Sequence, residues 1–174
     1  LLLLKNNSEA NTCGASWFKN PEREQYLRYS PPIYQDPPVS LLVRHENRVR
    51  FESYDSFAQA LRDPTLRFGV VSGFSYGEGV DAMIAVAQAL PVQAPNNLSM
   101  FRMLLAGRFE FLVTDEVEAT GQLHDLAEPM TQVRFISYPD LPEGSWRHIT
   151  CNLKTSPDVM ARIAAAVSQV GGDS

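Results

Sequence analysis

The stretch that decides the fold is residues 66–117, which read LRFGVVSGFSYGEGVDAMIAVAQALPVQAPNNLSMFRMLLAGRFEFLVTDEV. Apolar runs of strand length alternate there with segments whose apolar residues recur every three or four positions. The expected strands are 66–71, 91–94 and 109–114, and the expected helices are 76–90, 98–106 and 115–124. A strand–helix unit repeated three times with short connections predicts an α/β fold, in which helices cover a parallel sheet through right-handed crossovers.

Polar residues follow two of these strands, at the positions where ligands bind in open parallel sheets. Ser72, Gly73 and Ser75 follow the first strand, and Asp115 follows the third. Free backbone N–H groups at a helix N-terminus, together with a serine hydroxyl, favour a carboxylate or another anion. Ser75 could equally cap the helix. Asp115 would suit a ligand ammonium group, although capping the next helix is the simpler role.

The turn 73–77 also matches the Gly-x-Ser-x-Gly elbow of serine hydrolases, and it lies between a strand and a helix as that motif requires. Ser75, then Asp115 or Asp125, then His148 follow one another in the order of that fold. However, no glycine-rich oxyanion loop precedes the strand, and His148 falls within a predicted strand. A serine hydrolase that uses Ser75 is therefore the second hypothesis.

The flanking regions predict further elements by the same criteria. The expected strands are 12–18, 39–43, 133–138 and 147–153, and the expected helices are 53–62 and 157–170. Residues 45–52 indicate a charged connection. Ser156 and Pro157 are typical of a helix start. Five prolines make a long helix improbable within 19–38.

Composition limits the class of protein. The chain has 174 residues, is 44% hydrophobic and carries a formal net charge of −5, so it can bury a core in one large or two small units. A nucleic-acid partner is disfavoured, because phosphate neutralisation needs a basic face. No stretch approaches the roughly 20 apolar residues that span a bilayer. The apolar residues 1–4 favour a buried strand whose upstream part is missing.

The two cysteines, Cys13 and Cys151, lie too far apart for a zinc or redox motif. They could pair in a secreted protein or be two unrelated buried thiols. The three histidines are isolated, so we expect no metal ion and no cofactor. Arg23 lies within an aromatic-rich segment that could form core or could wall a ligand pocket. Arginine grips carboxylates through two parallel hydrogen bonds, which makes Arg23 a candidate ligand residue.

Four segments in order resemble the bacterial extracellular solute-binding family 3, which serves polar amino acid uptake. They are 15–23 (ASWFKNPER), 29–34 (YSPPIY), 68–75 (FGVVSGFS) and 105–115 (LAGRFEFLVTD). The resemblance covers nearly the whole chain. It implies a two-lobed type II periplasmic-binding fold with parallel sheets flanked by helices, and a receptor that is not an enzyme.

By this resemblance, Arg23 and Ser75 would hold the carboxylate of an amino acid-like ligand, and Asp115 would hold its ammonium group. Ser16 and Phe18 would lie near Arg23, and the turn of Ser75 would contribute Ser72 and Gly73. The resemblance also implies export to the periplasm or beyond and a partner permease of an ABC transporter. Three departures from the family pattern, at Phe18, Lys19 and Phe74, leave the ligand side chain open. A ligand-sensing domain of a signalling receptor fits the same resemblance.

The resemblance divides the chain into one lobe of residues 1–45 and 138–174 and a second lobe of residues 46–137. The family's first βαβα segment has no counterpart here, so lobe one would be incomplete and could favour self-association. Cys13 and Cys151 would share that lobe. Export into an oxidising compartment then favours a disulfide between them.

Overall fold

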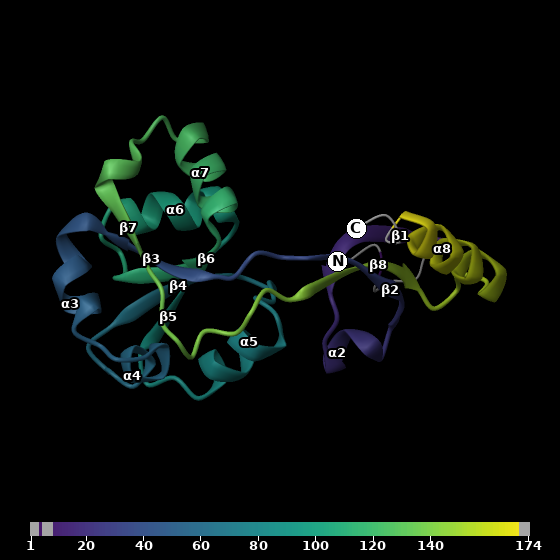
Figure 1. Cartoon of the computed structure of the whole chain (residues 1–174), viewed down its shortest axis with the longest axis horizontal. Helices are drawn as coiled ribbons and strands as arrows, with labels where there is room; N and C mark the ends of the chain where they lie inside the picture. Colours follow the sequence, from purple (N-terminus) through teal and green to yellow (C-terminus); the bar gives the residue numbers. More distant parts are fainter. Residues whose placement is uncertain (1–3, 5–8, 171–174) are drawn as a thin grey trace. The chain divides into compact units, whose positions relative to one another are not determined.

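The computed structural model of the chain describes Leu4 and residues 9–170, and it divides them into two compact units (Figure 1). Unit 1 contains the described residues up to Asp36 and those from Gly144 onward, whereas unit 2 is Pro37–Glu143. Among the described residues, no helix combines the length and the apolar character needed to cross a membrane.

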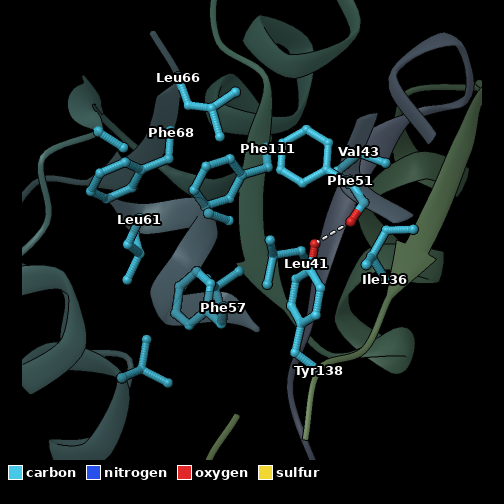
Figure 2. Close-up of a cluster of buried hydrophobic side chains, with 14 residues drawn as sticks. Leu41, Val43, Phe51, Phe57, Leu61, Leu66, Phe68, Phe111, Ile136 and Tyr138 are labelled. Carbon is cyan, nitrogen blue, oxygen red and sulfur yellow. Dashed lines mark hydrogen bonds between the residues drawn. The ribbon is translucent and has the colours of Figure 1, made fainter. Parts of the chain in front are cut away.

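The limits of the units differ from the predicted division, which placed residues 37–45 and 138–143 with the first lobe. Strand β3 (Ser40–Arg44) pairs on both sides with strands of unit 2. Tyr138 is buried in the core of unit 2, where its hydroxyl donates a hydrogen bond of 2.5 Å to the carbonyl of Phe51 (Figure 2). These residues therefore belong to unit 2, because their sheet pairing and packing lie there.

A five-stranded sheet in the order β5-β4-β6-β3-β7 organises unit 2. Its other strands are β4 (Arg67–Val71), β5 (Leu90–Ala94), β6 (Phe111–Thr114) and β7 (Val133–Ile136). The predicted parallel pairing is confirmed for β4 with β5 and for β4 with β6. Strand β3 runs antiparallel to both β6 and β7, so the sheet as a whole is mixed.

Strand β3 begins at the edge of the sheet where the parallel strands end, because Ser40 lies opposite Thr114 in the register. Strand β7 returns to the same edge, and the hydroxyls of Ser40 and Ser137 lie 2.9 Å apart there. Both connections to unit 1 therefore leave unit 2 from the edge that carries the predicted ligand residues of unit 2. We call it the strand-end edge.

Helices cover both faces of this sheet (Figure 1). They are α3 (Arg48–Glu52), α4 (Phe57–Leu61), α5 (Glu78–Ala85), α6 (Asn97–Leu105) and α7 (Glu116–Asp125), with short 3-10 turns at His45–Asn47 and Met130–Gln132. Phe51, Phe57 and Phe111 pack edge to face in the core cluster on one side (Figure 2). Phe101 and Leu104 of α6 contribute to the cluster on the other side.

Local capping sets several helix boundaries. Asp115 caps α7 through the backbone N–H of Glu118, at 2.8 Å, as the sequence predicted. Ser56 caps α4, so this helix begins later than the predicted 53–62, and Asn96 caps α6 one residue earlier than expected. Helix α5 is shorter than the predicted 76–90, because the turn before it and the segment after it are not helical.

Gly69 in the middle of β4 is required by close packing. A Cβ built there would lie 2.6 Å from Cε2 of Phe109, whose ring is fully buried. Because ordinary contacts to a Cβ atom are longer, alanine at this position would force the ring or the strand to move.

Unit 1 is built on a three-stranded antiparallel sheet in the order β1-β8-β2, which differs from the predicted parallel arrangement. Its elements are β1 (Cys13–Phe18), α2 (Pro21–Glu24), β2 (Leu27–Gln35), β8 (Trp146–Asn152) and α8 (Pro157–Val170). Strand β2 was not predicted, because it contains Pro31 and Pro32. Both are tolerated because β2 is an edge strand, and its register shifts around Pro32.

A disulfide joins Cys13 of β1 to Cys151 of β8, which confirms the expected pairing. The two cysteines lie opposite each other in the antiparallel register. The bond therefore links two segments of unit 1 that are 138 residues apart in sequence.

Candidate functional site

Arg23 lies on the short helix α2, whose start is fixed by Pro21 and by the capping side chain of Asn20. Its side chain folds back onto β1. The Nη1 group donates a 3.2 Å hydrogen bond to the carbonyl of Phe18, and the guanidinium lies 5.2 Å from the ring centroid of Trp17. Only 7% of the residue is exposed. The fold therefore holds Arg23 in a defined orientation against β1.

The charge of Arg23 is incompletely satisfied. A guanidinium has five N–H donors. Within the part of the chain that the structure describes, Arg23 uses one of them, for the carbonyl of Phe18, and it forms no ion pair. A buried cation without a counter-charge is costly. The remaining donors are thus suited to an anionic group from outside the chain.

Tyr29 shares the same carbonyl acceptor, because its hydroxyl lies 3.5 Å from the oxygen of Phe18. Burial raises the pKa of Tyr29 to about 12, although the nearby charge of Arg23 acts in the opposite direction. The phenol therefore stays protonated at neutral pH and acts as a donor. Sequence reasoning placed Tyr29 in an aromatic segment but did not identify this contact.

Ser16 and Phe18 lie on β1, where the carbonyl of Phe18 contacts Arg23. Ser16 has a positive φ of 66° and lies within an irregularity between Gly14 and Trp17. The ring of Phe18 is covered by the guanidinium of Arg147, which lies 3.6 Å from the ring centroid. Phe18 thus contacts Arg147 through its ring and Arg23 through its carbonyl. Nothing in the sequence indicated a part for Arg147, which lies 129 positions after Phe18.

The turn after β4 lies at the strand-end edge of unit 2. The hydroxyl of Ser72 donates to the side-chain carbonyl of Gln93, at 2.9 Å. Gly73 has a φ of 74°, which favours glycine, and open space surrounds the position of its missing side chain. Phe74 at the tip of the turn is 56% exposed. The turn is therefore accessible from outside.

The hydroxyl of Ser75 is engaged by a carboxylate of the chain itself. It donates to Asp81 at 2.5 Å, and the backbone N–H of Tyr76 donates to the same carboxylate at 2.8 Å. The N–H of Gly77 in turn donates to the hydroxyl of Ser75, at 3.3 Å. A ligand carboxylate at this turn would have to compete with Asp81. Sequence reasoning missed Asp81, although a carboxylate in the first turn of a helix often bonds to the preceding N–H groups.

Tyr76 anchors this turn to the core. Its hydroxyl accepts a 2.8 Å hydrogen bond from the backbone N–H of Val71 and lies 3.8 Å from the sulfur of Met100. Burial raises the pKa of Tyr76 to about 12. The turn is therefore connected to both β4 and α6, which limits how far Ser75 can move.

Asp115 lies at the same edge, after the neighbouring strand β6. One of its carboxylate oxygens caps α7. Glu118, one turn later, accepts hydrogen bonds from the side chains of Asn97 and Thr114. The edge therefore carries the three carboxylates of Asp81, Asp115 and Glu118, and it favours a positively charged ligand group over a negative one.

The predicted ligand residues thus form two sets, one in each unit. In unit 1, Arg23 contacts the carbonyl of Phe18, and Ser16 lies two residues before Phe18 on the same strand. Ser72, Gly73 and Ser75 share one turn in unit 2, and Asp115 follows the adjacent parallel strand. Within the described residues, no group of three or more His, Cys, Asp or Glu side chains could hold a metal ion.

Two hollows of unit 2 lie elsewhere, around the C-terminal end of α6. They measure about 470 and 440 Å³, and both are lined by Leu105, Ala106 and Gln132. They are shallow, and they contain none of the predicted ligand residues. We therefore assign candidate ligand residues in each unit separately, from the side-chain chemistry at the strand-end edge of unit 2 and around Arg23 in unit 1.

Known proteins were compared with the chain by sequence and by structure. The sequence matches no protein-family model and no curated protein. An ancestral arginine-binding protein bound to arginine is similar in structure, with a TM-score of 0.71 at 18% identity over 98% of this chain and 69% of that one. The amino acid ABC transporter substrate-binding protein AbpA from Streptococcus pneumoniae, bound to L-arginine, gives a TM-score of 0.71 at 14% identity, over 97% and 65% of the two chains.

The VFT2 domain of BvgS from Bordetella pertussis is similar to nearly the same degree. Its TM-score is 0.68 at 16% identity, over 98% of this chain and 66% of that one. The chain thus spans 65–69% of the length of these solved structures. At such low identities the likeness shows the fold, and this chain therefore has the α/β fold of the two-lobed type II periplasmic binding proteins.

Proposed function

We propose that this chain is part of an extracytoplasmic receptor that captures a small solute with a carboxylate and a positive group, such as an amino acid. In this proposal the receptor binds its ligand without changing it chemically. The observation that carries the proposal is Arg23, a buried arginine with unused donors and no ion-pair partner among the described residues. Guanidinium and carboxylate match in geometry as well as in charge.

Unit 2 supports the same ligand class from its own side chains. The carboxylate of Asp115 lies at the strand-end edge, with Asp81 and Glu118 on neighbouring elements. An ammonium or guanidinium group would be attracted to this edge, whereas a ligand carboxylate would be attracted to Arg23. We propose that closure of the two units around the solute engages both sets of residues, as in hinge-closing binding proteins.

We further propose that the receptor is exported and that it delivers its ligand to a membrane permease of the ABC type. The disulfide between Cys13 and Cys151 supports export, because such bonds persist in oxidising compartments. The similar solved structures include an ABC transporter substrate-binding protein. Delivery to a permease and sensing by a receptor would use the same site, and a pull-down of membrane partners separates these two roles.

A thermal-shift screen tests the binding proposal. The chain is heated with each amino acid and, in parallel, with the corresponding amino acid amide, which lacks the carboxylate. A ligand at 100 times its dissociation constant should stabilise the chain by about 2.7 kcal/mol. We expect at least one amino acid to stabilise the wild-type chain, and its amide to stabilise the chain less. In Arg23→Ala this difference between the acid and its amide should disappear.

Arg67→Ala is the matched control for this screen, because Arg67 forms an exposed ion pair with Glu110 in unit 2, away from the strand-end edge. It should bind as the wild type does. A folded wild-type chain that no amino acid stabilises would contradict the proposed ligand class.

Hydrolysis by Ser75 is tested separately. A serine hydrolase needs its serine hydroxyl to donate to an imidazole. Here the hydroxyl donates to Asp81, and Nδ1 of His148 lies 2.9 Å from the carbonyl oxygen of Ser30. A phosphonate probe that reacts with activated serines should leave the chain unlabelled. Stoichiometric labelling that disappears in Ser75→Ala would overturn the receptor proposal.

A further inference from the structure

Arg147 uses all three nitrogens and one face of its guanidinium group for contacts within unit 1. Its Nε group lies 2.9 and 2.8 Å from the two carboxylate oxygens of Asp36, and its Nη2 group lies 2.6 Å from one of them. Its Nη1 group donates to the carbonyl of Ser16, at 3.1 Å. The face of the guanidinium lies over the ring of Phe18. One side chain therefore joins β1, the end of β2 and β8.

These contacts converge on the residue that orients Arg23. Phe18 is paired with Arg147 across the antiparallel register, and its ring is covered by the guanidinium. The carbonyl of the same Phe18 accepts hydrogen bonds from Arg23 and Tyr29. A shift of Phe18 would move that acceptor, and Arg23 would lose its alignment.

The position of Asp36 gives the contact a second consequence. Asp36 is the last residue of unit 1 before the chain enters unit 2, and its backbone N–H donates to the carbonyl of Ser145, at 3.0 Å. The side chain of Gln35 also donates to the carbonyl of Gly144, where the chain returns. Arg147 therefore connects the segment that carries the ligand-binding arginine with the residues at which the chain crosses between units.

We infer that Arg147 is a positioning residue for the ligand carboxylate: it fixes Phe18 and thereby the direction of the Arg23 donors. The inference rests on the proposed function of Arg23 as the carboxylate-binding residue. A lysine at position 147 retains the positive charge but not the planar group that covers the ring and pairs with Asp36 through two bonds. The role thus depends on the guanidinium and not on the charge alone.

The test compares Arg147→Lys with the wild-type 174-residue chain, and Arg67→Lys serves as the matched control of an arginine–carboxylate pair. Calorimetry measures the affinities for L-arginine, L-glutamate and L-leucine and for their amides. We expect Arg147→Lys to lower the acid-to-amide affinity ratio about tenfold, the factor for one misaligned charge-assisted hydrogen bond. Arg67→Lys should leave the ratio unchanged, and Arg23→Ala defines its minimum. A purely structural role would weaken acid and amide equally, which would overturn the inference.

A second measurement does not depend on a ligand. The indole N–H resonance of Trp17, assigned by its loss in Trp17→Phe, reports on the guanidinium of Arg23 beside the ring. It should shift in Arg147→Lys, and also in Asp36→Asn, which removes the ion pair but keeps Arg147. A resonance that stays in place in both folded variants would refute the positioning role. A wild-type chain that binds none of the probes refutes the proposed function, while the Trp17 resonance still decides the role of Arg147.

Discussion

The disulfide between Cys13 and Cys151 allows a quantitative prediction about how the chain unfolds. The bond closes a loop of 138 residues in sequence. If the whole chain unfolds in one step, a loop of this length corresponds to about 5 kcal/mol of stabilisation in the chain-entropy model. If unit 2 stays folded while unit 1 unfolds, only about 30 flexible residues remain in the loop, and the same relation gives about 3.7 kcal/mol.

The variant Cys13→Ser/Cys151→Ala removes the bond, with alanine at the fully buried position and serine at the exposed one. Both tryptophans, Trp17 and Trp146, lie in unit 1, so their fluorescence reports the unfolding of that unit alone. Far-UV circular dichroism reports both units. Urea unfolding of the variant and the wild type, followed by both signals, therefore measures where the stability is lost.

We expect the unfolding free energy obtained from fluorescence to be about 3–5 kcal/mol lower in the variant than in the wild type, as the loop-entropy relation gives. If the fluorescence and circular dichroism transitions of the wild type coincide, the two units unfold together and the larger value applies. If the fluorescence transition comes at lower urea, unit 1 unfolds first and the smaller value applies. Reduction of the wild type should reproduce the variant. A fluorescence transition unchanged to within about 1 kcal/mol would refute a stabilising role for the bond in unit 1.

Three further predictions follow from unit 2. Asp81→Asn removes one of the three negative charges at the strand-end edge and should weaken the binding of a ligand with a positive group about fivefold, the factor for an ion pair worth about 1 kcal/mol; unchanged or tighter binding in calorimetry would contradict a positive ligand group at this edge. Gly69→Ala should lower the unfolding free energy by roughly 1–3 kcal/mol, because the new Cβ meets the buried ring of Phe109; Gly121→Ala, with open space around it, is its control and should not destabilise the chain. Hydrogen bonds to Asp63 hold its pKa below the usual range, so its contribution should be present above about pH 4 and lost as the pH falls further; Asp63→Asn should therefore flatten the acid limb of a pH–stability curve, and an unchanged limb would contradict this.

Local signals in the sequence determined most of unit 2. The alternation of apolar runs with helical periodicity located β4, β5 and β6 and the helices between them, because each element is encoded within five to fifteen residues. Asp115 was recognisable as a cap for the same reason: the cap and the N–H it accepts from are three residues apart. The start of α8 at Pro157 also followed from adjacent residues.

The candidate ligand residues were accessible to sequence reasoning only in part. Resemblance to a solute-binding family pointed to Arg23, and the structure adds that its donors are largely unused within the described chain. The hydrogen bond from Ser75 to Asp81 was not predicted, because Asp81 lies six residues further along the chain and several nearer polar side chains could have been the partner. The turn is therefore not the open anion site that was expected, because the carboxylate of Asp81 already accepts hydrogen bonds from it.

What the sequence by itself determined is the set of elements and the chemical types of the residues at their ends. Only the tertiary structure decided that β2 forms in spite of its prolines, that β3 belongs to unit 2, and that Arg147 covers Phe18. These features depend on strand pairing between segments far apart in the chain. Register and partner are set by the packing of whole faces against one another, and no short stretch of sequence encodes them.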